Sequence, residues 1–95
     1  MKLEGIRVLD LSSNMPGPYM SMLLADNGAE VTKIEQPGGE AGRRIGIVEG
    51  DSSVFFRNLN RGKLSVTLDL KARADREKLL ELCLSGRRSR ATGQV

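Results

Sequence analysis

The sequence contains no histidine and a single cysteine, Cys83. With one thiol and no imidazole, the chain lacks the side chains from which zinc sites are built, and we expect no metal site. A lone cysteine also excludes an internal disulfide, which fits a reducing compartment, so we expect a cytoplasmic protein. Aromatic residues are scarce as well, because Tyr19, Phe55 and Phe56 are the only three.

Long apolar stretches are also missing. No run approaches the roughly 20 residues that span a bilayer, and the amino terminus lacks the apolar core and cleavage site of a secretory signal. The composition, 39% hydrophobic and 28% charged, predicts a soluble globular protein without a membrane partner. Its 95 residues suffice for one small domain, near the size at which a single core is only marginally stabilising.

The net charge of +3 does not indicate a nucleic-acid partner. Residues 1–84 contain 12 basic and 12 acidic residues, so the excess comes from Arg87, Arg88 and Arg90. A neutral body with a short basic tail differs from the basic stripe that follows a phosphate backbone, and three aromatics offer little for base stacking. We therefore expect no nucleic-acid binding.

Alternating and periodic apolar residues predict an α/β fold. Strands are expected at 6–11, 30–35 and 64–70, helices at 18–27 and 71–84, and a short helical turn at 53–58. The first strand, first helix and second strand form a parallel βαβ unit. The glycine-rich stretch from 36 to 53 is predicted to be a long polar loop.

The two helices each carry apolar residues at helical spacing. In the first helix this set is Met20, Leu23 and Leu24, followed by Asn27 before the glycine that ends the helix. In the last helix the residues expected to face a core are Leu79, Leu80, Cys83 and Leu84.

The corner Pro16-Gly17-Pro18 limits which nucleotide the βαβ unit can bind. A helix amino terminus that follows a strand attracts anions. Glu35 follows Gly17 by 18 residues, where dinucleotide-binding folds place the acidic residue that holds the ribose. Pro16 and Pro18, however, remove two N–H donors from the turn that would cradle phosphate. The prolines argue against NAD or FAD, and they leave open a rigid corner without any ligand.

A family resemblance is carried by two segments, GIRVLDLSSNMPGPYMSMLLADNGAEVTKIEQPGGE and FFRNLNRGKLSVTLDLK. Both are similar to the amino-terminal part of class III CoA-transferases, the CaiB/BaiF family, and the similarity covers residues 1 to about 82. Each element is weak alone, but their order and separations make the set specific. The family includes formyl-CoA transferases, carnitine CoA-transferases and α-methylacyl-CoA racemase.

The resemblance implies that residues 1–84 are the incomplete amino-terminal part of a Rossmann-like domain, a fragment of a larger fold that forms an interlocked homodimer. It implies an acyl-CoA:carboxylic acid CoA-transferase, with a CoA thioester as substrate and no tightly bound cofactor. A fragment of a racemase-type enzyme and a CoA-binding module without catalysis are the alternatives. The chain alone is expected to be inactive, because the resemblance implies that the catalytic residues lie beyond the stretch that this chain covers. Four of its aspartates are read as surface or turn carboxylates and match no catalytic position of the family: Asp10, Asp26, Asp51 and Asp69.

The resemblance also implies which residues contact CoA. Asn14, Met15 and Pro16 match positions that lie against the CoA. Leu68 and Lys71 match positions around the adenosine and its phosphates, with which an ammonium group can pair. Gln36 stands where several members have an arginine that meets the nucleotide, so it can offer a hydrogen bond without a charge. No catalytic and no metal-binding residue is assigned.

Residues 85–95, SGRRSRATGQV, differ in pattern from the rest of the chain. They show no apolar periodicity and no acidic residue, where the family resemblance implies a hydrophobic strand. The change suggests translation out of frame after about Cys83, and a natural short form is the alternative. We expect a divergent basic tail without fixed structure.

Overall fold

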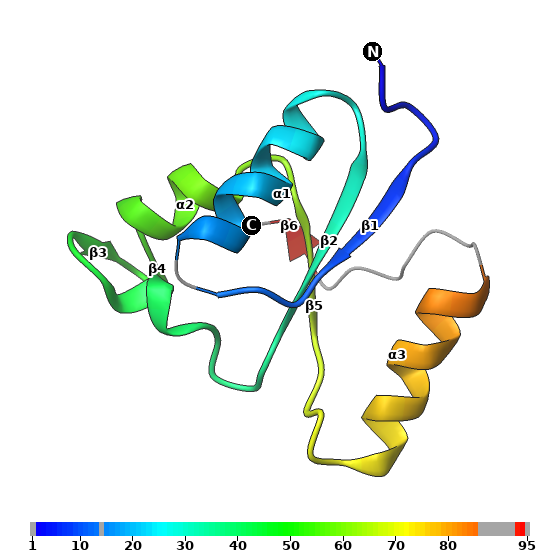
Figure 1. Ribbon diagram of the computed structural model, residues 1–95. Helices are drawn as coiled ribbons and strands as arrows, with labels where there is room; N and C mark the ends of the chain where they lie inside the picture. The colour runs from blue at the N-terminus through cyan, green and yellow to red at the C-terminus, as the bar shows by residue number, and fades with distance from the viewer. Residues whose placement is uncertain (1, 14, 86–92, 95) are drawn as a thin grey trace.

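Three parallel strands and one short antiparallel strand form the sheet at the centre of the molecule (Figure 1). The computed structural model describes residues 2–13, 15–85 and 93–94. The strand order is β1-β2-β5-β6, with bounds Arg7–Asp10, Glu30–Glu35, Leu64–Thr67 and Gly93–Gln94. Asp10 pairs with Lys33 at the end of the β1–β2 ladder, and Glu35 pairs with Thr67 at the end of the β2–β5 ladder. The predicted α/β fold with parallel strands is confirmed.

Helices lie on both faces of this sheet. α1 (Pro16–Asp26) and α2 (Val54–Asn60) lie on one side, and α3 (Arg73–Ser85) lies on the other (Figure 1). Side chains alternate along a strand, so neighbouring residues of β2 meet different helices. The Lys33 ammonium lies 5.6 Å from the centre of the Phe56 ring of α2, whereas Ile34 belongs to the apolar cluster that packs against α3.

The Pro-Gly-Pro corner begins α1 two residues earlier than predicted. Pro16 is the first helical residue and Pro18 the third, and proline suits this first turn because its N–H groups have no partner within the helix. Gly17 is required by a close approach, since a Cβ at this position would lie 2.3 Å from the Cβ of Ser12. The corner is therefore a tight contact between the first turn of α1 and the loop that follows β1.

The buried face of α1 is not formed by the apolar residues that stand at helical spacing. Met20 and Leu23 are 66% and 42% exposed, while Ser21 and Met22 are buried. The hydroxyl of Ser21 donates a hydrogen bond of 2.6 Å to the carboxylate of Asp10, and this contact turns the polar residue inward. Apolar spacing alone does not identify the buried face of α1, because the end of β1 offers this helix a charged partner.

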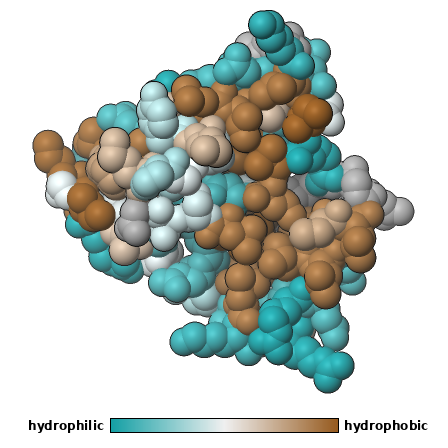
Figure 2. Space-filling model, viewed as in Figure 1, coloured by the Kyte–Doolittle hydropathy of each residue, from teal (hydrophilic) through white to brown (hydrophobic). Residues whose placement is uncertain are grey.

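The prediction of which residues of α3 face a core is wrong in part. Leu79 and Leu82 pack against the cluster of Ile34, Val66 and Leu68. Leu80 and Leu84, predicted to face a core, are 58% and 84% exposed, and Cys83 is exposed too. Figure 2 shows a band of apolar surface that runs from the sheet to the adjacent side of α3.

The predicted polar loop between β2 and α2 contains regular structure. A 3-10 helix, η1 (Ala41–Arg44), is followed by an antiparallel hairpin of β3 (Val48–Glu49) and β4 (Ser52–Ser53). Ser53 caps α2 by accepting a hydrogen bond from the Phe56 amide at 3.0 Å, and its hydroxyl donates to the Gly42 carbonyl at 2.7 Å. The prediction of a plain loop was wrong because these buried polar contacts order the segment.

The last described residues return to the sheet. Gly93 and Gln94 form β6, which pairs antiparallel with β5 opposite Ser65 and Leu64. The expected tail without fixed structure is thus contradicted at these two positions, while residues 86–92 and 95 lie outside the described part of the chain.

Candidate functional site

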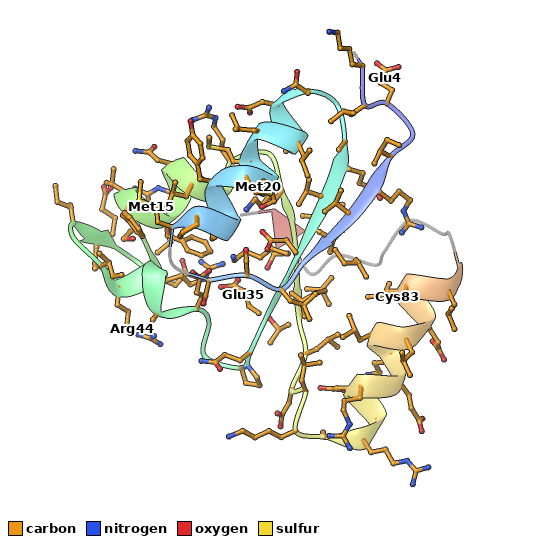
Figure 3. All side chains as sticks on the ribbon, in the orientation of Figure 1. Glu4, Met15, Met20, Glu35, Arg44 and Cys83 are labelled. Atoms are coloured by element: carbon orange, nitrogen blue, oxygen red, sulfur yellow. The ribbon has the colours of Figure 1, made fainter. Side chains whose placement is uncertain are left out.

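A cleft of about 500 Å³ opens where β1, β2 and β5 end. Loops at the carboxyl ends of parallel strands form the ligand sites of open α/β sheets. The lining comes from the end of β2, from the segments that follow the three strands and from the start of η1: Leu11, Ser12, Ser13, Ile34, Glu35, Gln36, Glu40, Ala41, Leu68, Asp69, Leu70 and Lys71. Glu35 lies in the middle of the molecule, whereas Arg44 lies at its periphery (Figure 3).

Three of the six residues predicted to contact CoA line this cleft: Gln36, Leu68 and Lys71. Met15 precedes α1 and is 57% exposed, and Pro16 is the first residue of that helix. Neither of these two is part of the lining. Asn14 lies outside the described residues. The structure therefore brings together the predicted residues that follow β2 and β5, whereas Met15 and Pro16 are not part of the lining.

Hydrogen bonds fix the turn that carries Lys71. The Lys71 amide donates to the Asp69 carboxylate at 3.0 Å, and the Asp69 amide donates to Asp75 at 2.7 Å. The guanidinium of Arg76 donates to the carbonyls of Leu70 and Lys71 at 2.9 and 3.1 Å. The backbone at Lys71 is thus held from both sides, while its side chain is exposed.

The charged residues around the cleft differ in whether they are already held in ion pairs. Glu40 forms a 2.7 Å ion pair with Lys33, and Glu35 forms a 2.7 Å ion pair with Arg43. Neither Lys33 nor Arg43 is part of the described lining, in which Lys71 is the one basic residue. An anionic ligand in the cleft would therefore meet the Lys71 ammonium group, two carboxylates that already have cationic partners, and the carboxylate of Asp69, which accepts a hydrogen bond from the Lys71 amide.

Glu35 is not free to hold a ribose. Its carboxylate accepts hydrogen bonds from Arg43 at 2.8 and 2.7 Å and from the Glu40 amide at 3.0 Å. Burial opposes the ionisation of Glu35, but the hydrogen bonds from Arg43 and Glu40 outweigh it and lower its pKa. Because this carboxylate orders the loop after β2, the acidic residue that would hold the ribose in a dinucleotide-binding fold has a structural role here.

Asp10 is buried, which corrects its interpretation as a surface or turn carboxylate. It is 5% exposed, and its carboxylate forms a 2.8 Å ion pair with the Lys63 ammonium. Lys63 also donates to the side chain of Asn60 at 2.6 Å and to the carbonyl of Pro18 at 3.1 Å. The pair therefore joins the end of β1 to the residues before β5 and to the first turn of α1.

The pKa of Asp10 makes the stability of the fold sensitive to acid. Burial opposes ionisation, but hydrogen bonds from Lys63, Ser12 and Ser21 outweigh it and lower the pKa from 3.8 to about 2. A lowered pKa contributes stability above the unfolded-state pKa, and this contribution, about 2 kcal/mol, is lost as pH falls from about 5 to about 2.

Urea unfolding across this range is expected to show the loss, and Asp10→Asn is expected to flatten it. An unchanged slope in the variant would assign the acid sensitivity to other groups.

The amino terminus of α1 offers few donors to an anion. Of its first three residues only Gly17 has an N–H group, because the other two are prolines. The Tyr19 amide is already bonded to the Met15 carbonyl at 2.9 Å. The helix terminus that cradles phosphate in dinucleotide-binding folds is therefore poorly suited to that task here.

Several lining residues were missed by sequence reasoning: Leu11, Ser12, Ser13, Glu40, Ala41, Asp69 and Leu70. The strand predictions held the signal for Ser12 and Ser13, because residues directly after parallel strands meet at one edge of the sheet. Leu11, Asp69 and Leu70 fell within the predicted strands, and Glu40 and Ala41 within the predicted loop. Within the described ranges, no helix has the length and apolarity needed to cross a membrane. In the same part of the chain, no cluster of metal-ligating side chains could hold a metal ion.

Comparison with known proteins places this chain in a family. The family model of CoA-transferase family III matches residues 3–85. A succinyl-CoA:mesaconate CoA-transferase of Haloarcula hispanica is 46% identical over 85 residues, covering 84% of this chain and 22% of the relative. An acetyl-CoA:oxalate CoA-transferase of Acetobacter aceti is 42% identical over 80 residues, covering 83% of this chain and 21% of the relative.

A solved structure of a protein from this family also matches the chain. The crystal structure of a CaiB/BaiF family protein from Brucella suis matches with a TM-score of 0.77 at 34% identity, covering 83% of this chain and 22% of that protein. The chain thus spans about a fifth of the length of the relatives it matches.

Proposed function

The chain belongs to CoA-transferase family III, and from this premise we propose that its cleft binds the nucleotide portion of a CoA thioester. The complete enzyme is proposed to transfer CoA from an acyl-CoA donor to a carboxylic acid acceptor. The names of the two relatives above, which pair an acyl-CoA donor with a dicarboxylic acid acceptor, support this class of reaction. The chain described here would contribute CoA contacts without catalysing the reaction alone.

The observation that carries this proposal is the position of Lys71. Its backbone is fixed by Asp69 and Arg76, and it is the one basic residue in the described lining. CoA carries several phosphate charges, and a charge-assisted hydrogen bond from an ammonium group to phosphate is stronger than a neutral one. Gln36 and the apolar Leu70 line the same cleft, so polar and apolar parts of a nucleotide both find partners there.

The remaining expectations belong to the same proposal. Asn14, Met15 and Pro16 are proposed to contact CoA once the rest of the enzyme closes over the Pro-Gly-Pro corner. The complete enzyme is proposed to be a cytoplasmic homodimer that holds no tightly bound cofactor. A catalytic residue is proposed to come from the part of the enzyme that this chain does not include.

Replacing Lys71 by alanine tests the proposal. The variant is expected to bind CoA about tenfold more weakly at about 50 mM salt, because one charge-assisted contact with phosphate is lost. The difference is expected to shrink to about twofold at about 500 mM salt, since exposed charges are screened. Isothermal titration calorimetry of the chain with CoA at both salt concentrations measures the effect.

Lys78→Ala is the matched control. Lys78 lies on α3, outside the cleft lining, and pairs with Asp75 at 3.7 Å. This variant removes the same charge and is expected to leave CoA affinity within about twofold of the parent chain. Equal losses for both variants would show that net charge, and not the Lys71 contact, governs binding.

A further inference from the structure

Lys33 is a buried cation that contacts two different walls of the cleft. Its side chain is 0% exposed, and its ammonium group lies 2.7 Å from the Glu40 carboxylate. The same ammonium donates a hydrogen bond of 3.0 Å to the Ser12 carbonyl. Ser12 follows β1 and Glu40 precedes η1, so one side chain joins segments that are separated by more than twenty residues in the sequence.

Stability alone does not explain a lysine at this position. Taking an ammonium and a carboxylate out of water costs so much that apolar pairs of similar volume are often equally or more stable. Val31 faces the same side of β2 two residues earlier and is 1% exposed, so the sheet accommodates an apolar side chain on this face. The charged pair is therefore better explained by what it holds together.

Both partners of Lys33 line the cleft, whereas Lys33 itself is not part of the described lining. The Phe56 ring lies 5.6 Å from the ammonium group, and the Glu40 amide is bonded to Glu35 at 3.0 Å. The bridge from Ser12 to Glu40 thus connects the β1 loop to a segment that is already anchored on β2.

We propose that Lys33 is a positioning residue that sets the separation of the Ser12 and Glu40 walls and thereby tunes the affinity of the cleft for CoA. This inference rests on the proposed CoA function. Lys33 acts through its two partners and does not touch the ligand. Without the bridge, the two walls lose their shared anchor. Ordering them then costs free energy when the ligand binds, and the affinity falls.

Three variants separate positioning from mere stabilisation. Lys33→Met leaves the Glu40 carboxylate buried without its cation, so both the thermal midpoint and CoA affinity are expected to fall. Glu40→Gln keeps an oxygen that can accept from Lys33, so the bridge is retained and this variant is the reference for the double variant, although its midpoint is expected to fall because Lys33 loses its counter-ion. The double variant removes both charges, so its midpoint is expected to recover toward that of the parent, while its CoA affinity stays at least about tenfold weaker than that of Glu40→Gln.

Calorimetry with CoA and thermal unfolding give the two readouts. A double variant that regains both its midpoint and its affinity would overturn the proposal, because Lys33 would then matter only for stability. A stable double variant that binds weakly supports it, since a purely structural role predicts that stability and affinity recover together.

Hydrogen exchange gives a readout that needs no ligand. The amide of residue 40 is expected to exchange at least about tenfold faster in the double variant than in Glu40→Gln, because only the former lacks the bridge. Equal exchange would overturn the positioning role. Absence of CoA binding by the parent chain would instead overturn the proposed function, while the exchange comparison would still decide whether Lys33 holds the wall.

Discussion

Replacing Asp10 by asparagine is expected to lower the free energy of unfolding by about 2–5 kcal/mol, the largest effect that we predict for a single polar side chain. The substitution keeps the size of the side chain but removes its charge, so the Lys63 ammonium remains buried without a counter-ion. Lys63 is 1% exposed, and water cannot easily replace the lost carboxylate. Urea unfolding followed by circular dichroism measures the change.

An exposed pair of the same kind supplies the control. Asp26 pairs with Arg61 at 2.8 Å, the same distance as between Asp10 and Lys63, but the Asp26 side chain is 38% exposed. Asp26→Asn is expected to cost less than about 1 kcal/mol, because water solvates both exposed partners. Similar losses for the two variants would show that burial does not govern the Asp10 pair.

Phe56→Ala is expected to lower the free energy of unfolding by about 3–5 kcal/mol as well. The ring is 1% exposed, and the guanidinium carbon of Arg43 lies 4.2 Å from its centre. Truncation leaves a cavity beneath η1 and also removes the cation–π contact with Arg43. The variant is therefore expected to loosen the Glu40 wall of the cleft, which hydrogen exchange at the amides of 40–44 would detect.

The neighbouring phenylalanine is the matched control for this cavity. Phe55 lies on the same helix but is only partly buried, so Phe55→Ala is expected to cost roughly half as much as Phe56→Ala. Faster exchange at 40–44 is expected only in the Phe56 variant. If Phe55→Ala were equally destabilising, the packing of α2 against η1 would not depend on the buried ring.

Local patterns predicted the parallel part of the fold well. Residues 30–35 were predicted as a strand and form β2 with these bounds, because the β-branched residues Val31, Thr32 and Ile34 favour a strand there without competing signals. Residues 64–70 were predicted as one strand, but β5 ends at Thr67, opposite the last residue of β2. β5 stops pairing where β2 ends, and the local sequence of β5 does not show where its partner strand ends.

The candidate site was predictable only in part. Lys71, Gln36 and Leu68 were named from motif positions, and the cleft brings these three together. The burial of Asp10 was missed, because its partner Lys63 lies 53 residues away along the chain. Pairings over such separations depend on the register of the sheet, which local periodicity does not contain.

The central claim is that the cleft at the ends of β1, β2 and β5 binds CoA. Titrating the isotope-labelled chain with CoA, and following its amide signals by NMR, tests this most directly. CoA binding in the cleft predicts shifts concentrated at Ser12, Ser13, Gln36, Leu70 and Lys71, with little change on the outer face of α3. Absence of shifts at about millimolar CoA, a concentration that populates even weak complexes, or shifts confined to other surfaces, would contradict the claim.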